Sequence, residues 1–509
     1  MGTKVAVATT SSGAADVAAE VAELGGNAVD CAIAAAIYST NTEPGVCALA
    51  GSAYVTVWPA AADPVTIDGN VAVPGIGRQE GPAPPADQVH MEYGGSVNTV
   101  VGPASVAVPG TPAALDLAAT RYAALDWRQL VAPTIRAARD GFPLSSACHY
   151  YLQYSGDAIF GRSDDGHGAL HHADGSLREA GSTIRVPHLA ESLEVIADDG
   201  CRAFYEGAIA EKITAHVEGR GGLLTARDLQ SYEPIVRDSL TVDVDDWRVA
   251  TNPPPAVGGA VLSAMLLAFA QNPVREWDAE AVRQLVRVQE AALSYRMEKL
   301  DLAEDPAAAI AELLGLARSG ELLSRRRSGA TVHTSAVDDT GLACAITASS
   351  GYGSGEMPAG TGLWLNNCLG ELELNRHGLE ASPPGRRLPS NMAPTTARCD
   401  GRVLAMGSPG ADRITTALHQ FIINYTQLRL GLFDAVAHPR VHLDIGAEEP
   451  NLAVEPGLDV PDTGYPLVRH DAINMYFGGV GAALFDAQHG FEVAADPRRE
   501  GGTFISDGP

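Results

Sequence analysis

Hydroxyl side chains gather in one short segment of the sequence, residues 328–338 (SGATVHTSAVD). The simplest interpretation is a solvent-facing strand that follows a flexible linker of small residues. The segment also has what an autocatalytic N-terminal nucleophile needs, because small residues lead up to Ala330 and Thr331 follows. The Thr331 hydroxyl would attack the carbonyl before it. The freed α-amine of Thr331, with a pKa of about 8, would then act as its base.

Other groups of reactive residues are weaker candidates. The acidic and histidine residues at 164–172 could suggest a metal site, but no later ligand has suitable spacing, so a solvated hairpin loop is preferred. Residues 479–481 (GVG) lack the third glycine and the βαβ context of a dinucleotide-binding loop. Ser354 is one place out of register for the nucleophile elbow of a serine hydrolase.

The elements that must position Thr331 can be predicted from hydrophobic periodicity and turn signals. A helix that starts at Asn27 or Asp30 is apolar nearly all round, so we expect it to be buried between layers. Residues 75–97 are rich in Gly and Pro and predict a loop. Further helices are predicted at 14–24, 111–122, 126–140, 203–217, 258–270, 278–299 and 412–429, and strands at 3–8, 53–58, 65–68, 239–250, 331–337, 342–347, 363–366, 403–407 and 481–487.

The character of the chain changes near residue 330. Helices dominate the first two-thirds, residues 320–330 form a polar link with a basic run, and short β-like runs follow. This pattern would normally suggest two domains. One α/β body, with sheets that take strands from both ends of the chain, is the alternative.

Composition excludes several classes of function. The 509 residues carry 62 Asp plus Glu against 35 Lys plus Arg, a net charge of -27, which argues against binding to nucleic acid or to anionic membranes. The seven cysteines are scattered and form no disulfide framework. The N-terminus has no signal-peptide pattern and no apolar run is long enough to span a bilayer, so a cytoplasmic location is expected.

Several remote segments occur in a characteristic order over most of the chain: 26–36 with Glu43-Pro44, 105–111, 132–142, 204–207, Asp305-Pro306, 407–410 (GSPG) and 496–501 (DPRREG). Together they resemble the γ-glutamyltransferase family. That family belongs to the N-terminal nucleophile hydrolases, so the resemblance implies an α+β fold in four layers, αββα. It also implies cleavage between Ala330 and Thr331 into a large segment, 1–330, and a small segment, 331–509, that stay in one intertwined body.

The resemblance also assigns catalytic parts. Thr331 corresponds to the nucleophile that begins the small subunit, and Ser349 stands where the family has a second threonine that hydrogen-bonds it. Gly410 and Ala411 stand where the family has two glycines whose N–H groups form the oxyanion hole, and an alanine still supplies its N–H.

Substrate recognition departs further from the family pattern. Asn70 occupies the place of the arginine that clamps the glutamyl α-carboxylate, and a neutral amide cannot replace that bidentate cation. Glu371 keeps an acid in the segment that binds the glutamyl amine, whereas Cys368 cannot replace its amide. Asn391 replaces one of two adjacent serines. The expected pocket residues are Asn70, Asn366, Glu371, Ser390 and Asn391.

The sequence therefore predicts an autoprocessing threonine hydrolase of a small acyl or amide substrate. No metal or organic cofactor, nucleic acid or membrane is expected to take part, and the two fragments, or a homodimer of such pairs, would be the assembly. The lost clamp favours a biosynthetic enzyme, including one that removes an oxalyl-type group by C–C hydrolysis. A genuine γ-glutamyl transferase or glutathione hydrolase is the alternative. A non-catalytic binding protein on the same fold is the second.

Overall fold

A computed structural model describes residues 3–78, 86–93, 97–322, 331–375, 378–379, 382–410, 413–445 and 449–506. Its central feature is a seven-stranded sheet in which every neighbouring pair is antiparallel. Thr331 immediately precedes one of the inner strands of this sheet. In spatial order the strands are β20 (Gly502–Ile505), β1 (Val5–Thr9), β11 (Val332–Asp338), β12 (Ala343–Ser349), β2 (Ser52–Trp58), β3 (Val65–Gly69) and β8 (Ile235–Asp238).

A second antiparallel sheet of six strands packs on the first. Strand β11 contacts both β14 and β18 of this second sheet, so the nucleophile strand lies at the interface of the two sheets. The spatial order is β19 (Gly490–Ala494), β18 (Gly481–Asp486), β14 (Arg402–Gly407), β13 (Thr395–Cys399), β10 (Trp247–Thr251) and β9 (Leu240–Val244).

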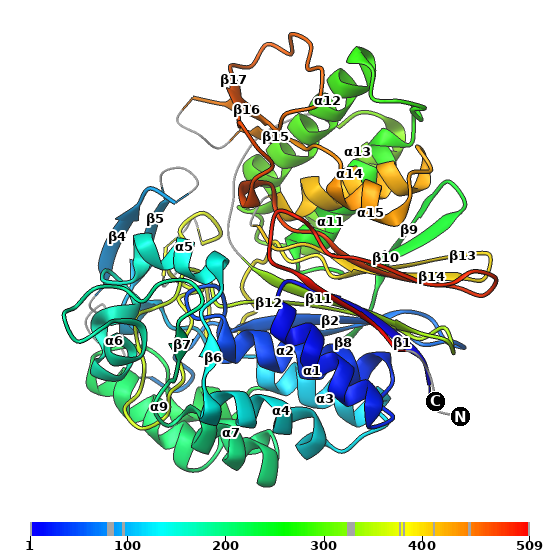
Figure 1. Ribbon diagram of the computed structural model, residues 1–509. Coiled ribbons are helices and arrows are strands. Elements are labelled where there is room, and N and C mark those ends of the chain that lie inside the picture. The colour runs from blue at the N-terminus through cyan, green and yellow to red at the C-terminus, as the bar shows by residue number, and fades with distance from the viewer. Residues whose placement is uncertain are drawn as a thin grey trace.

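Helices cover the outer face of each sheet, which gives four layers in the order helix, sheet, sheet, helix (Figure 1). The predicted αββα architecture is thereby confirmed. The first sheet is covered by α1 (Ser12–Glu23), α2 (Ala28–Thr42), α3 (Thr111–Tyr122), α4 (Trp127–Asp140) and, outside these, α7 (Leu189–Asp198); the second by α11 (Val257–Phe269), α12 (Ala279–Tyr295), α13 (Pro306–Ser319), α14 (Arg413–Thr426) and α15 (Leu432–Ala437).

Smaller elements surround these layers. None of the helices in the described ranges is both long and apolar enough to cross a membrane. The remaining strands and helices are β4 (Asp87–Met91), β5 (Val97–Val101), β6 (Phe142–Pro143), α5 (Ser146–Ser155), α6 (Asp164–Leu170), β7 (Thr183–Ile184), α8 (Arg202–Tyr205), α9 (Ala208–Gly219), α10 (Ala226–Gln230), β15 (Val441–Asp444), β16 (Asn451–Val454) and β17 (Leu467–Arg469).

Strands from both sides of residue 330 are present in each sheet. In the first sheet, β11 lies between β1, from the start of the chain, and β12, which in turn pairs with β2. In the second sheet, β13 pairs with β10 in the same way. The arrangement matches the single-body alternative rather than two domains. Ala330 lies outside the described residues, and the predicted cleavage after it stays a prediction.

Several local expectations were wrong. The predicted helix at 203–217 is divided at Gly207, with a φ of 86°, into α8 and α9. Residues 239–250 form the β9–β10 hairpin rather than one strand, because the chain turns at Asp245 with a φ of 51°. The predicted loop at 75–97 contains β4, which pairs with β5. Residues 363–366 form no strand but only an isolated bridge between Leu365 and Ala50, next to which the Asn366 side chain donates to the carbonyl of Ala50.

The start of α2 is fixed by two side chains of the sequence-predicted cap. Asn27 is the N-cap residue and its side chain accepts hydrogen bonds from the N–H groups of Val29 and Asp30. The fully buried Asp30 carboxylate accepts bonds from the N–H groups of Asn27 at 2.8 Å, Ala124 at 2.9 Å and Leu125 at 3.0 Å. Asp30 therefore joins α2 to the chain that enters α4.

Replacing Asp30 by alanine should leave these buried N–H groups without their acceptor. We expect Asp30→Ala to lower the free energy of unfolding by roughly 3 kcal/mol, seen as a lower apparent Tm in thermal unfolding. The matched control is Asp278→Ala, which removes the exposed cap of α12 and should cost only about 1 kcal/mol. Equal losses in the two variants would contradict this account of α2.

Candidate active site

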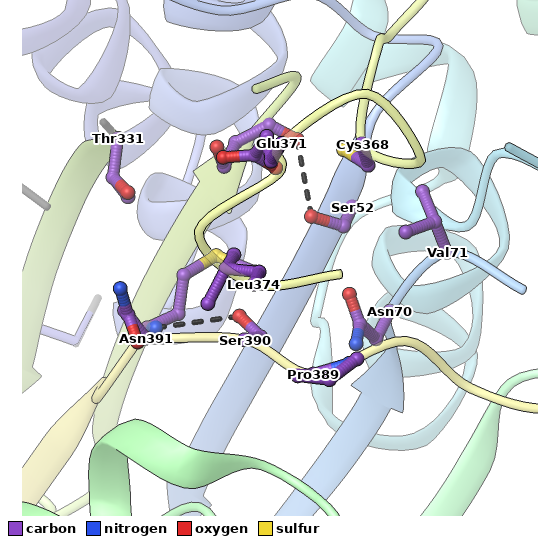
Figure 2. A pocket seen from close by; sticks show the side chains of 12 residues that line it. Ser52, Asn70, Val71, Thr331, Cys368, Glu371, Leu374, Pro389, Ser390 and Asn391 are labelled. Carbon is purple, nitrogen blue, oxygen red and sulfur yellow. Dashed lines mark hydrogen bonds between the residues drawn. The ribbon is translucent and has the colours of Figure 1, made fainter. Parts of the chain in front are cut away.

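One pocket brings together residues from four remote parts of the chain. Four hydroxyls, two amides, one carboxyl and one thiol face it, together with a few apolar groups. Figure 2 shows Thr331 and Asn391 on one side, Asn70 and Val71 on the other, and Glu371 and Ser52 between them. The lining residues are Ser52, Asn70, Val71, Thr331, Ser349, Cys368, Glu371, Leu374, Pro389, Ser390, Asn391 and Met392.

The structure places Thr331 and Ser349 on neighbouring strands at this pocket. Val332 of β11 is paired with Ala348 of β12. Thr331, the residue before Val332, therefore lies beside Ser349, the last residue of β12. Ser349 Oγ accepts the N–H of Gly351 at 3.2 Å, and its carbonyl accepts Ser52 Oγ–H at 3.1 Å. Thr331 is 4% exposed. The predicted nucleophile and its hydroxyl partner therefore share one small polar enclosure.

Asn70 lies at the end of β3, at the opposite wall. Its amide nitrogen donates to the carbonyl of Leu388 at 2.6 Å, which leaves its oxygen on the pocket side (Figure 2). Arg387 lies behind this wall, where its guanidinium donates to the Asn70 carbonyl at 3.0 Å and stacks 4.2 Å from the ring of Tyr232. Because its guanidinium makes these contacts behind the wall, Arg387 does not replace the lost carboxylate clamp.

Among the described residues that line the pocket, Glu371 is the only one with a carboxylic acid side chain. Its side chain is 5% exposed, and burial raises its pKa well above the ordinary value. The nearby carboxylate of Glu373, which accepts a hydrogen bond from Tyr352 at 2.7 Å, raises the pKa of Glu371 further. Burial and the charge of Glu373 both favour the protonated form of Glu371, which is a hydrogen-bond donor.

Ser390 and Asn391 reach the pocket from the segment that packs on the start of α11. The carbonyl of Ser390 accepts the N–H groups of Val257 and Gly258 at 2.9 and 3.0 Å. A Cβ on Gly258 would lie 2.1 Å from the carbonyl oxygen of Asn391, so only glycine permits this close approach. Both side chains are placed where the sequence predicted them.

Asn366 does not line the pocket, which corrects its predicted place. Its side chain is fully buried, donates to the carbonyls of Ala50 and Ala107 at 2.9 Å each, and accepts the N–H of Cys368 at 3.1 Å. Because these bonds use its amide group on the backbone of three segments, Asn366 holds the pocket frame instead of a ligand.

Gly410 lies in the turn that follows β14, close to Gly478. Its φ is 115°, and a Cβ at this position would lie 2.7 Å from the Cα of Gly478. Ser408 supports the turn, because its Oγ donates to the Pro409 carbonyl at 2.7 Å and accepts the N–H of Gly479 at 3.0 Å. The second predicted oxyanion residue, Ala411, lies outside the described residues.

Sequence reasoning missed part of the lining. Ser52 follows a glycine with no motif to mark it, and Val71, Leu374 and Met392 are ordinary apolar residues. Cys368, set aside as a poor substitute for an amide, does line the pocket. Burial raises the pKa of its thiol well above the ordinary value, so it is not a competing thiolate nucleophile.

The structure was also searched for side chains that could bind a metal ion. Within the described residues no group of three or more His, Cys, Asp or Glu side chains is placed to hold a metal ion. In the 164–172 segment, the rings of His167 and His171 stack at 4.2 Å, and residues 164–170 are helical, not a hairpin loop as preferred above.

Both the sequence and the fold of this chain are similar to those of known proteins. The family model of gamma-glutamyltranspeptidase matches residues 14–506. The chain belongs to this family. The predicted resemblance and the assignment as an enzyme of the gamma-glutamyltranspeptidase family are therefore confirmed.

Individual relatives agree with the gamma-glutamyltranspeptidase assignment. The chain is 28% identical to the glutathione hydrolase proenzyme of Escherichia coli K12, with 90% of this chain and 83% of that protein covered. It is 29% identical to the glutathione hydrolase proenzyme of Pseudomonas aeruginosa, with 97% and 93% covered. Cephalosporin acylase from Bacillus halodurans has the same fold, with a TM-score of 0.83, 22% identity, and 100% and 97% of the two chains covered.

The Gly410 turn gives a test of the predicted oxyanion site. A Cβ at Gly410 would displace the turn, so Gly410→Ala should slow acylation by p-nitrophenyl acetate roughly 10²–10³-fold, measured as the initial burst of p-nitrophenolate. Gly401→Ala is the control, since Gly401 also has a positive φ of 78° but its nearest neighbour to a Cβ is 3.6 Å away. A Gly410→Ala burst as fast as that of the control would count against the assignment.

Proposed function

We propose that this protein is an autoprocessing N-terminal threonine hydrolase that acts on a small acyl or amide-type substrate through an acyl-enzyme. The observation that carries the proposal is the place of Thr331, which directly precedes the inner strand β11 and lines a pocket with hydroxyl, amide and acidic side chains. The proenzyme names of the E. coli and P. aeruginosa relatives support processing. A cytoplasmic location and a homodimer of processed pairs stay predictions.

Processing would begin with an N-to-O acyl shift. The Thr331 hydroxyl attacks the Ala330 carbonyl, the C–N bond breaks, and the nitrogen takes up the proton and becomes the α-amine of Thr331. Water then hydrolyses the resulting ester, which leaves a carboxylate on Ala330 and a free hydroxyl on Thr331. The pieces 1–330 and 331–509 would stay together, because each sheet contains strands of both.

Turnover would use the same hydroxyl. The Thr331 α-amine accepts the hydroxyl proton as the oxygen attacks the acyl carbon, and N–H groups of the turn at Gly410 stabilise the oxyanion. The leaving group departs with a proton, and water hydrolyses the ester. Ser349, at the facing end of β12, would orient the Thr331 amine or hydroxyl.

The pocket chemistry favours a small acyl group recognised by neutral hydrogen bonds. Its lining residues, all within the described part of the chain, include no Lys, Arg or His to bind the α-carboxylate of a glutamyl group. Protonated Glu371, with the hydroxyls of Ser52 and Ser390, supplies donors instead. We propose an oxalyl-type group, whose carboxylate these hydrogen-bond donors would bind without a cation, removed by C–C hydrolysis in a biosynthetic pathway.

Glutathione hydrolysis is the second candidate, favoured by the names of the relatives at 28–29% identity. In that case Glu371 would lose its proton to pair with the glutamyl ammonium. The two candidates thus need opposite protonation states of one carboxyl group.

Cleavage itself is the first test of the proposed function. Intact-mass measurement of the wild-type chain should give two polypeptides, 1–330 and 331–509, whereas Thr331→Ala should stay whole. Thr334→Ala is the matched control, because Thr334 lies on the same buried strand but is not part of the pocket lining, and it should be cut like the wild type. A wild-type chain that stays whole, or a Thr331→Ala chain that is cut at the same bond, would overturn the proposal.

The pH dependence of turnover should separate the two substrates. Raising the pH through the elevated pKa of Glu371 removes the proton that the oxalyl candidate requires, so kcat/KM for an oxalyl anilide should fall. Glu371→Gln keeps an amide donor and should flatten that fall. For a γ-glutamyl anilide the sign reverses: kcat/KM should rise with Glu371 ionisation, and Glu371→Gln should abolish turnover. Robust γ-glutamyl turnover that rises in this way would replace the oxalyl proposal.

A further inference from the structure

A buried histidine two residues after Thr331 connects the nucleophile strand to the second sheet. Both ring nitrogens of His333 form hydrogen bonds: Nδ1 is 2.8 Å from Thr347 Oγ1, and Nε2 is 2.7 Å from Ser335 Oγ. Ser335 Oγ also donates to the carbonyl of Gly481 at 3.1 Å. These partners lie on β11, β12 and β18, so one side chain connects three strands across both sheets.

The network fixes the protonation state of the ring. Because the Ser335 hydroxyl gives its proton to Gly481, it accepts the bond from the Nε2–H of His333. Nδ1 is then the acceptor of the Thr347 hydroxyl proton. Burial lowers the pKa of His333 to about 3, so the ring stays neutral at physiological pH and is a fixed connector.

The same ring packs against the base of the Gly410 turn. A Cβ on Gly407, the last residue of β14, would lie 2.2 Å from His333 Cε1, so the glycine is required by the ring. Gly407 is paired with Gly481, and residues 408–410 continue directly from it. Thr331 directly precedes β11 and is two residues from His333, the spacing at which side chains of an extended chain face the same side.

We propose that His333 is a positioning residue that holds the Thr331 end of β11 in register with the turn at 408–410, where the oxyanion forms. The inference rests on the proposed function, since it concerns the geometry of the same reaction. His333 does not touch the acyl group. It acts through the Thr347 and Ser335 hydroxyls on one side and through the Gly407–Gly481 pair on the other.

The reaction that tests this role is the self-cleavage of the chain, which needs no knowledge of the substrate. Full-length chain made by cell-free synthesis is sampled over time, and the fraction cut is read by intact mass. His333→Leu removes both hydrogen bonds and should slow cleavage between about 10- and 100-fold. His333→Gln restores one donor and one acceptor and should recover part of the rate.

The matched control is His419→Leu. His419, on α14, is also a fully buried imidazole whose pKa burial lowers to about 3, but neither of its ring nitrogens has a partner among the described residues. The His419→Leu chain should be cut at the wild-type rate even where its Tm falls as far as that of His333→Leu. This comparison separates positioning from general loss of stability.

A second pair of variants tests the contact with the turn and also serves if His333→Leu does not fold. Gly407→Ala should slow cleavage, and the penalty should shrink when His333→Ala removes the ring that the new methyl group meets. If wild-type chain is cut but His333→Leu is cut equally fast, or if the Gly407→Ala penalty is the same with and without the ring, the positioning role is wrong and the proposed function stands. If the wild type stays whole, the proposed function itself fails.

Discussion

The pairing of β11 with β1 on one side and with β12 on the other is the constraint on which the rest of the molecule depends. β11 is buried on both faces, with Ala336 packed toward the helices of the first layer and Val337 toward the second sheet. A strand held by two neighbours and two layers has one register. That register places Thr331 in the lining of the pocket and His333 against the second sheet.

The charges near the pocket are paired behind its walls. Asp68, fully buried at the end of β3, forms an ion pair with Arg237 at 2.8 Å. Arg387 donates hydrogen bonds to backbone carbonyls and stacks on the ring of Tyr232. The pocket itself presents hydroxyls, amides and the carboxyl group of Glu371, whose pKa burial raises. In a site lined by buried side chains, an oxyanion gains more from oriented N–H groups than it would in water. The arrangement suits acyl transfer to a threonine hydroxyl.

Sequence alone was informative where local chemistry decides the structure. The Asn27 cap, the α2 helix and the layer order follow from periodicity, capping residues and the family resemblance, and the predicted residues Asn70, Glu371, Ser390 and Asn391 all reach the pocket. It was less informative where long-range packing decides. Nothing in the sequence around Asn366 shows that three backbone segments use its amide, and nothing around Ser52 shows that it faces Thr331. The His333 connection could have been suspected, because residues 331, 333 and 335 are polar at strand spacing.

The central claim is that the hydroxyl of Thr331, and no other oxygen of the pocket, forms the acyl-enzyme. The most direct measurement is to quench the reaction with p-nitrophenyl acetate in acid and locate the acyl group by tandem mass spectrometry. The account predicts a hydroxylamine-labile ester on the Thr331 side chain, at the N-terminus of the 331–509 polypeptide. An ester on Ser52, Ser349 or Ser390, with Thr331 unmodified, would contradict it.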